Sequence, residues 1–241
     1  MFGDISFKSL PIVVKNLLII NGLIFLSTYT FPEIKTFLAL HPIQSENFLP
    51  HQIITHMFMH GNFSHLFFNM FGLWIFGKLL EKIWGPKKFL TYYMATGLGA
   101  VLIYSIIHQI EISIIESGLT SMEIARVNSV KLIPGGYYGT PLSVIEEKLF
   151  LFYNTPVVGA SGAIYGLLLA FGYLFPNSVI YLYLAIPIKA KYFVLGLGLI
   201  SLFSGIMPNP SDNVAHFAHL GGMIFGFILL KYWKQDRNNF Y

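Results

Sequence analysis

The sequence predicts an all-α membrane protein, a bundle of six transmembrane helices with short extramembrane helices. Hydrophobic residues make up 55% of the 241 positions and charged residues only 11%, whereas soluble domains carry roughly 25% charged residues. The mean hydropathy is +0.64. Apolar stretches of membrane-spanning length recur along the chain, so we treat residues 1–241 as one domain with spans at about 12–31, 63–80, 89–107, 157–175, 192–206 and 214–232.

The first three spans follow from apolar runs between turn signals. The first run contains Lys15 and ends before Pro32, and no convincing cleavage site follows it. We therefore expect a retained helix rather than a signal peptide. The second run carries histidines and Asn69 in its first half and is apolar in its second half. The third, residues 89–107, has no charged residue and would form about 28 Å of helix.

Residues 108–156 are predicted to form an extracytoplasmic loop insertion that contains short helices. Thr120 and Glu123 have the spacing of a capping box, and Thr140 followed by Pro141 predicts a second helix start. Apolar residues then recur at helical spacing, at Leu142, Ile145, Leu149 and Phe152. This pattern fits an amphipathic helix on the membrane surface and equally a helix packed on its own loop.

The last three spans begin with the run that contains Ser161, which Pro176 ends. Residues 179–188 are interrupted by Pro187 and followed by lysines, so we expect a turn at the membrane interface before span five. A proline-rich turn at 207–213 separates spans five and six.

The distribution of basic residues predicts the orientation in the membrane. Six spans place both termini on one side, and with that side cytoplasmic only four of the 15 Lys and Arg residues lie outside, as the positive-inside rule requires. The four are Lys35, Arg126, Lys131 and Lys148. We therefore expect a multi-pass membrane protein with cytoplasmic N- and C-termini and with the starts of spans two, four and six at the outer face. The small size of the chain and the lack of an organellar presequence lead us to expect the bacterial inner membrane.

Composition also argues against several partners. No basic cluster is interleaved with aromatic residues, so we expect no nucleic acid. Zero cysteines exclude disulfides and thiol catalysis. His56, His60 and His65 could bind zinc, but no acidic residue completes the set. We predict neither a metal nor a cofactor.

Ser161 is the strongest candidate for chemistry in the sequence. It lies in a stretch of small residues between Gly159 and Gly166, which could alternatively be a helix-packing face. However, polar side chains within a membrane are costly and tend to face a bundle interior or a wet cavity. Spans two and six open with further polar side chains, including His65 and His219. These segments together resemble the parts of an active site.

Glycine spacing predicts how the serine would meet a histidine. Gly222 and Gly226 lie on the same face of span six as His219, and would let that helix pack closely on Gly162 and Gly166. A neutral imidazole within about 3 Å is the usual activator of a serine hydroxyl. Attack on a peptide carbonyl also needs donors for the developing oxyanion, and the candidates are Asn69, His65 and the backbone N–H of Ser161.

Three motifs follow one another in the chain: His56-x3-His60-x4-His65-x3-Asn69, then Gly159-Ala160-Ser161-Gly162-x2-Tyr165-Gly166, then Ala218-His219-x2-Gly222-x3-Gly226. With these motifs the chain resembles the rhomboid intramembrane serine proteases, of the bacterial six-transmembrane type, from span one to span six. The serine motif alone would be a weak signal, but three motifs in order on three spans are a strong one.

The resemblance implies a serine-type endopeptidase with a Ser161–His219 dyad that cleaves transmembrane or juxtamembrane segments. It implies that Asn69 and His65 stabilise the oxyanion and that Tyr165 packs on the His219 ring. It further implies that His60 helps to hold span two and that Glu81 makes structural hydrogen bonds. The implied partners are the lipid bilayer and membrane proteins with a helix-destabilised transmembrane segment.

Several alternatives compete with this interpretation. A catalytically inactive rhomboid-fold binder or chaperone would share the fold, although such relatives typically lack the serine or the histidine. A transporter with a histidine relay would show mid-span charges or paired repeats, and neither is seen. His216 could be the base, but the glycine spacing fits His219. Asp212, in the proline-rich turn, fits a solvated loop residue better than a third catalytic member.

Two departures from the family pattern are visible. The loop at 108–156 is far longer than the family minimum. Gln52 stands where many bacterial relatives carry an arginine in the first outer loop, so the bracing of that loop is expected to differ.

Overall fold

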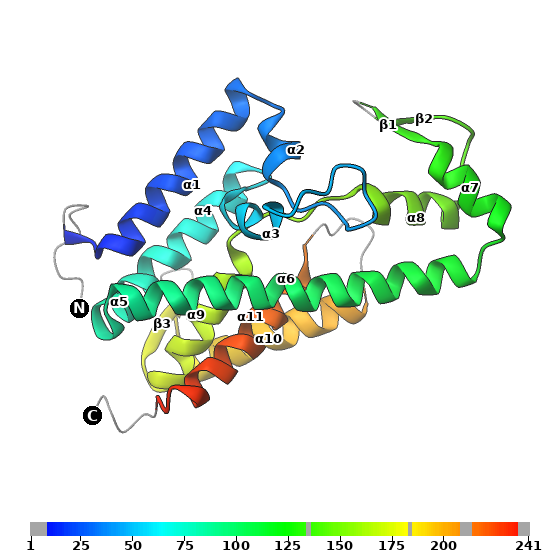
Figure 1. Ribbon diagram of the computed structural model, residues 1–241. Coiled ribbons are helices and arrows are strands. Elements are labelled where there is room, and N and C mark those ends of the chain that lie inside the picture. The colour runs from blue at the N-terminus through cyan, green and yellow to red at the C-terminus, as the bar shows by residue number, and fades with distance from the viewer. Residues whose placement is uncertain (1–8, 134–135, 183–184, 208–213, 236–241) are drawn as a thin grey trace.

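The computed structural model describes residues 9–133, 136–182, 185–207 and 214–235, and this part of the chain is a mainly helical bundle (Figure 1). Of the turn predicted at 207–213, residues 208–213, with Asp212, lie outside the described residues. The long helices are α1 (Ile12–Thr30), α6 (Pro86–Ser117), α9 (Ser161–Leu174), α10 (Ala190–Ile206), α11 (His216–Tyr232) and a composite of α4 (Phe63–Gly72), a π-helical turn (Leu73–Gly77) and α5 (Lys78–Trp84). The short ones are α2 (Ile34–Leu38), α3 (Gln52–Thr55), a 3₁₀ turn (His56–Phe58), α7 (Ser121–Ser129) and α8 (Val144–Asn154).

Three helices of the described chain are long and apolar enough to cross a membrane. They are α1, the continuous helix Phe63–Trp84 and α6, while α9 and α10 are shorter apolar helices. At the centre of the bundle α11 packs against both α6 and α9, and α6 also packs against α9. The molecule therefore has the helical membrane bundle that composition predicts.

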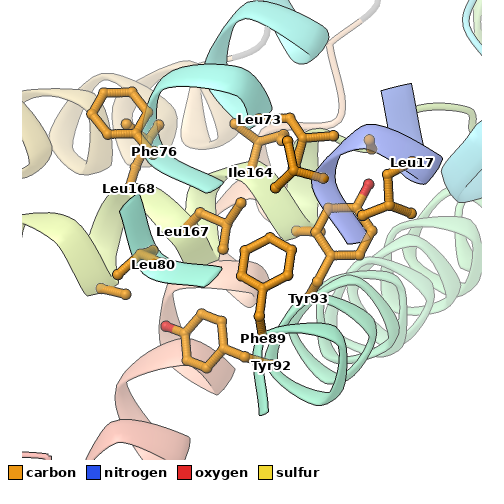
Figure 2. Packing of buried hydrophobic residues seen from close by; sticks show 14 of the residues in the cluster. Leu17, Leu73, Phe76, Leu80, Phe89, Tyr92, Tyr93, Ile164, Leu167 and Leu168 are labelled. Atoms are coloured by element: carbon orange, nitrogen blue, oxygen red, sulfur yellow. The ribbon is translucent and has the colours of Figure 1, made fainter. Parts of the chain in front are cut away.

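The main core lies where the composite helix, α6 and α9 converge (Figure 2). Its fully buried side chains come from all three elements and include Leu73, Leu80, Phe89, Tyr92, Tyr93 and Leu167. The outer surface is apolar as well: on α1, Leu23 and Leu26 are exposed by 62% and 64%. A bundle that faces lipid on the outside and packs on the inside has this composition.

Glu81 fastens α1 to the second helix. Its Oε1 accepts a hydrogen bond from the Val13 N–H at 2.9 Å and its Oε2 one from the Val14 N–H at 2.8 Å. These N–H groups belong to the first turn of α1, where no intrahelical acceptor exists and a negative charge is favourable. The predicted structural hydrogen bonds of Glu81 are thus confirmed.

The third helix is longer than the sequence suggested. We predicted that it ends at 107 and that a loop begins at 108, whereas α6 continues to Ser117. The polar residues of this extension find partners outside the bundle: the His108 ring nitrogen Nε2 lies 2.9 Å from the Phe152 carbonyl oxygen. On the same stretch Ile112 and Ile115 are buried in a second, smaller core.

The rest of the insertion folds around that extension. The capping box at the start of α7 is confirmed, because the Thr120 N–H donates to Glu123 Oε2 at 2.7 Å and the Glu123 N–H donates to Thr120 Oγ1 at 3.3 Å. The predicted start of the next helix at Thr140 and Pro141 is wrong. A second capping box begins α8 after Ser143, whose N–H donates to Glu146 Oε2 at 2.7 Å.

Helix α8 packs on protein rather than lying free. Leu149 and Phe150 are buried with residues of α6 and α7 in the second core, which agrees with the alternative of a helix packed on its own loop. Ile145, which the predicted apolar stripe included, is 43% exposed. Figure 1 shows α7 and α8 together at the C-terminal end of α6.

Two short antiparallel hairpins add to the helices. The first, β1 (Lys131–Ile133) and β2 (Gly136–Tyr138), lies in the insertion and pairs Lys131 with Tyr138. The second, β3 (Val179–Leu182) and β4 (Ile186–Lys189), pairs Val179 with Lys189 and occupies the stretch where we expected a turn at the interface. Its β-branched residues favour strand, and Pro187 is tolerated in a two-stranded ribbon because both strands are edges.

Candidate active site

Ser161 is the first residue of α9, not a residue within it. We predicted that the span begins at 157, but residues 157–159 are extended: Val157 exchanges two backbone hydrogen bonds with Leu40, of 3.0 and 2.8 Å, and the Gly159 N–H donates to the His56 carbonyl at 2.9 Å. Gly159 has a φ of +125°, which glycine adopts without strain. The serine is therefore held at the positive end of a helix.

His219 meets this serine from α11. Its Nε2 lies 2.9 Å from Ser161 Oγ, and its side chain is nearly buried, with 7% of its surface exposed. The ring of Tyr165, one turn along α9, stacks on the imidazole with 4.0 Å between centroids and 9° between planes. The imidazole is thus fixed in orientation by its stacking partner and faces the hydroxyl.

Gly222 makes this meeting possible by bringing the two helices into backbone contact. A Cβ at Gly222 would lie 1.9 Å from the Gly162 carbonyl oxygen, and one at Gly226 would lie 3.4 Å from the Gly166 Cα. The predicted pairing of the two glycine faces is therefore seen along both helices. No side chain other than hydrogen fits at Gly222 without moving a backbone.

Helix α6 completes the junction with residues that the sequence analysis did not single out. A Cβ at Gly162 would lie 2.4 Å from the Ala100 Cβ, and one at Gly166 would lie 2.6 Å from the Thr96 Cβ. The Tyr92 hydroxyl donates to the Gly166 carbonyl at 3.0 Å. These α6 residues are spaced by four and so lie on one face of the helix, but their partners on α9 are distant in the sequence.

His65 and Asn69 share one face of α4 on the other side of the serine. A Cβ at Gly159 would lie 2.7 Å from the His65 ring and 3.7 Å from Ser161 Oγ, so the ring lies against the segment that presents the serine. The buried Asn69 amide donates one hydrogen bond to the His65 carbonyl at 2.8 Å. An amide nitrogen has two protons, so the second N–H proton of Asn69 remains to donate to an oxyanion. The oxyanion roles of both residues stay predictions.

The other two histidines of the motif are buried behind this face. His56 is held by the Gln52 carbonyl, 2.9 Å from its Nδ1. His60 is 2% exposed, and its ring lies edge-on to that of His65 with 5.0 Å between centroids. It can steady the His65 ring by packing.

Gln52 braces the first outer loop from a fully buried position. Its Oε1 accepts from the N–H groups of His41 and Leu49 at 3.2 and 3.1 Å. Its Nε2 donates to the carbonyls of Asn47 and Thr36 at 2.9 and 3.1 Å. The loop is thus held by a neutral amide rather than by the guanidinium of many relatives, which explains how this departure is compatible with an ordered loop.

His216 lies one turn before His219 at the start of α11. Its ring is edge-on to that of His219, with 6.0 Å between centroids, and the ring nitrogen at hydrogen-bond distance from Ser161 Oγ is Nε2 of His219. Among the described residues no group of three or more histidine, aspartate or glutamate side chains is arranged to hold a metal ion.

Comparisons with known proteins give one consistent answer. Residues 49–235 match the Rhomboid domain. The chain is 28% identical, over 79% of its length, to RHOMBOID-like protein 12, mitochondrial, of Arabidopsis thaliana, and the match covers 48% of that protein. It is 26% identical over 90% of its length to Rhomboid protein 1, mitochondrial, of Saccharomyces cerevisiae, of which 51% is covered.

A third relative is the Bacillus subtilis protein YdcA, whose name provisionally calls it a rhomboid protease. It is 28% identical over 74% of this chain, and 64% of it is covered. The chain spans about half the length of the Arabidopsis and yeast relatives. With the family domain matched over most of its length, this multi-pass membrane protein belongs to the rhomboid family.

Proposed function

We propose that this protein is an intramembrane serine endopeptidase. The observation that carries the proposal is the 2.9 Å approach of His219 Nε2 to Ser161 Oγ, at a helix N-terminus and with the imidazole stacked on Tyr165. A serine hydroxyl is a weak nucleophile until a base accepts its proton, and a fixed neutral imidazole is suited to that task.

The proposed reaction runs through an acyl-enzyme. His219 accepts the Ser161 proton as the serine oxygen attacks the peptide carbonyl, and the negative charge moves to the carbonyl oxygen. The free Asn69 amide proton, the His65 ring and the Ser161 N–H are the donors for that oxyanion. The protonated His219 then gives its proton to the leaving amine. Water, deprotonated by the same imidazole, hydrolyses the ester and restores the serine.

The proposed substrates are membrane proteins with a transmembrane or juxtamembrane segment that unwinds locally. A peptide bond within a helix is hydrogen-bonded and shielded, so the serine can attack it only after local unwinding. Helix α10, which packs on α9 and α11, and the composite second helix are the proposed sides of the entry path from the lipid. The loop that leads into α11 is the proposed lid over the dyad, and its residues 208–213 lie outside the described residues.

We further propose six spans in a bacterial inner membrane, with cytoplasmic termini and a site that opens to the outer face. The distribution of basic residues supports this orientation. The similar proteins include organellar and bacterial ones, and either membrane would present the same chemistry to the bundle.

Cleavage of a model single-span membrane protein by the purified full chain tests the proposal. Wild type should cleave it, whereas Ser161→Ala and His219→Ala should lose at least about a thousandfold in rate. His216→Ala, one turn away on the same helix, is the matched control and should keep most of the activity. Cleavage retained by a purified, folded Ser161→Ala variant would contradict the assignment. Loss of cleavage in His216→Ala, with cleavage retained in His219→Ala, would make His216 the base instead of His219.

A further inference from the structure

An apolar groove lies between α9, α10 and α11, and its lining runs from Leu220, the residue after His219, to Phe227 near the other end of α11. Its volume is about 430 Å³, within the usual range for a small-ligand site. Figure 1 shows the three helices side by side. On α10 the lining residues recur at helical spacing along one face: Lys191, Val194, Leu195, Gly198, Leu199 and Leu202.

Gly198 provides much of the space in the groove. A Cβ at this position would lie 3.4 Å from the Met223 Cε, so a larger side chain would extend into the hollow between α10 and α11. By contrast, a Cβ at Gly196 would meet nothing within 4 Å, and Gly196 does not line the groove. Gly196 and Gly198 therefore differ in whether an added side chain enters the groove.

One end of the groove carries lysine side chains and a tyrosine hydroxyl. Lys191 lines it, as do Tyr173 and Phe227. Lys231 reaches the same end, because its Nζ donates to the Tyr173 hydroxyl at 3.0 Å and lies 5.5 Å from the Phe227 ring centroid. Among the described residues of 161–235, four lysines and no Asp or Glu occur. The local charge therefore favours an anion.

The groove has the length of one lipid leaflet. From Lys191 to Leu202 the helical rise is about 16 Å, and half of a bilayer's hydrocarbon core is about 15 Å. Tyr173 and Lys231 each lie twelve positions beyond Ser161 and His219 on their helices, which is about 18 Å. The basic end therefore lies at the opposite ends of α9 and α11 from the serine and the imidazole.

We propose that this groove binds one anionic phospholipid from the leaflet opposite the one to which the serine opens. An acyl chain would occupy the apolar face of α10, and Lys191, Lys231 and the Tyr173 hydroxyl would hold the phosphate. Basic pockets between transmembrane helices bind acidic headgroups in this way, and tyrosine is favoured at the headgroup level. The proposal does not depend on the proposed proteolysis.

Native mass spectrometry of the full chain in detergent, titrated with phosphatidylglycerol or phosphatidylcholine of identical acyl chains, tests the charge preference. Wild type should retain one phosphatidylglycerol with an affinity roughly tenfold or more above that for phosphatidylcholine. Lys191→Gln with Lys231→Gln should bring the two lipids to equal affinity. Lys87→Gln, an exposed lysine at the start of α6, should keep the preference. Equal retention of both lipids by wild type would refute the proposal.

Filling the groove tests the position of the site. Gly198→Leu should lose the tightly held phosphatidylglycerol, while Gly196→Leu should bind it as wild type does. Thermal unfolding of both variants checks that they are folded. The double substitution of Lys191 and Lys231 provides a second test that does not fill the groove. Undiminished phosphatidylglycerol binding by a folded Gly198→Leu variant would contradict the assignment.

Discussion

At the scale of single residues, the contact of Gly222 with the Gly162 carbonyl sets the distance between α9 and α11. Gly222→Ala would place a Cβ 1.9 Å from that oxygen, so one backbone must move. We expect a loss of about 1–3 kcal/mol in the free energy of unfolding and a large loss of activity, because the serine and the imidazole separate. Thermal unfolding in detergent and a cleavage assay measure the two effects.

The control for that substitution is Gly22→Ala on α1, where a Cβ would meet nothing within 4 Å. It should change the free energy of unfolding by less than about 1 kcal/mol. Equal stability of Gly222→Ala and wild type would show that the two helices are not held together at this glycine.

Gln52 gives a second residue-scale prediction. Gln52→Ala removes the hydrogen-bond partner of the buried His41 N–H and of three part-buried backbone groups, and we expect a loss of about 2 kcal/mol in stability together with faster proteolysis of residues 39–52. Gln44→Ala, an exposed glutamine of the same loop that bonds only to Gln109 among the described residues, should be nearly neutral. Unchanged protection of the loop in Gln52→Ala would show that other contacts hold it.

The candidate site residues could be predicted from sequence because each belongs to a short motif with a chemical meaning. Glycine spacing also indicated which faces of α9 and α11 meet. The contributions of Tyr92, Thr96 and Gln52 could not be predicted in the same way. Each depends on carbonyls or glycines that are distant in sequence, and a single tyrosine or glutamine in an apolar stretch does not reveal its partner.

At the scale of elements, Glu146 links α7 to α8. Hydrogen bonds from the Ser143 backbone and hydroxyl, with Arg126 in addition, hold the pKa of Glu146 below its ordinary value of 4.5. Arg126 Nη2 lies 2.5 Å from Glu146 Oε1. Because the folded state favours the charged carboxylate, this contribution is complete above pH 4.5 and is lost as the pH falls through the lowered pKa.

We therefore expect the segment 118–156 to open on acidification below pH 4.5, and hydrogen exchange of its amides measures this. Glu146→Gln should open the segment already at neutral pH and weaken the pH dependence, and Glu123, whose pKa is also lowered, accounts for the remainder. Glu147→Gln, at an exposed position on the same helix, should behave as wild type. Protection factors of the segment, which are corrected for the intrinsic pH dependence of amide exchange, that stay constant between pH 3 and pH 7 would contradict this account.

Element boundaries were less predictable than the elements themselves. Residues 108–117 resemble a loop in the sequence because their polar side chains interrupt an apolar run. In the structure α6 continues through them, and His108 and Glu116 find partners on α8. The sequence has two successive helix-start signals, Thr140 with Pro141 and then Ser143 with Glu146. The helix begins after Ser143, because the capping box there satisfies the backbone N–H groups of both of its residues. At Ser161 the helix starts late because the preceding residues pair with another loop.

At the scale of the whole molecule, α6 is longer than a membrane is thick. Its 32 residues measure about 48 Å, whereas the hydrocarbon core of a bilayer is about 30 Å thick. The C-terminal end of α6 therefore extends beyond the membrane, and α7 and α8 lie on that side of it. Since the chain has no cysteine, a single introduced cysteine shows on which side of the membrane its position lies. A membrane-impermeant maleimide should label Met122→Cys in intact cells and Lys87→Cys only after permeabilisation. The reverse pattern would invert the proposed orientation.

The central claim is that His219 activates Ser161 for attack on a carbonyl, and a fluorophosphonate probe tests it most directly. Incubated with the purified full chain, the probe should form a single covalent adduct that peptide mass spectrometry locates at Ser161. The adduct should be absent from Ser161→Ala, strongly reduced in His219→Ala and retained in His216→Ala. An adduct on another residue, or equal labelling of wild type and His219→Ala, would contradict the account.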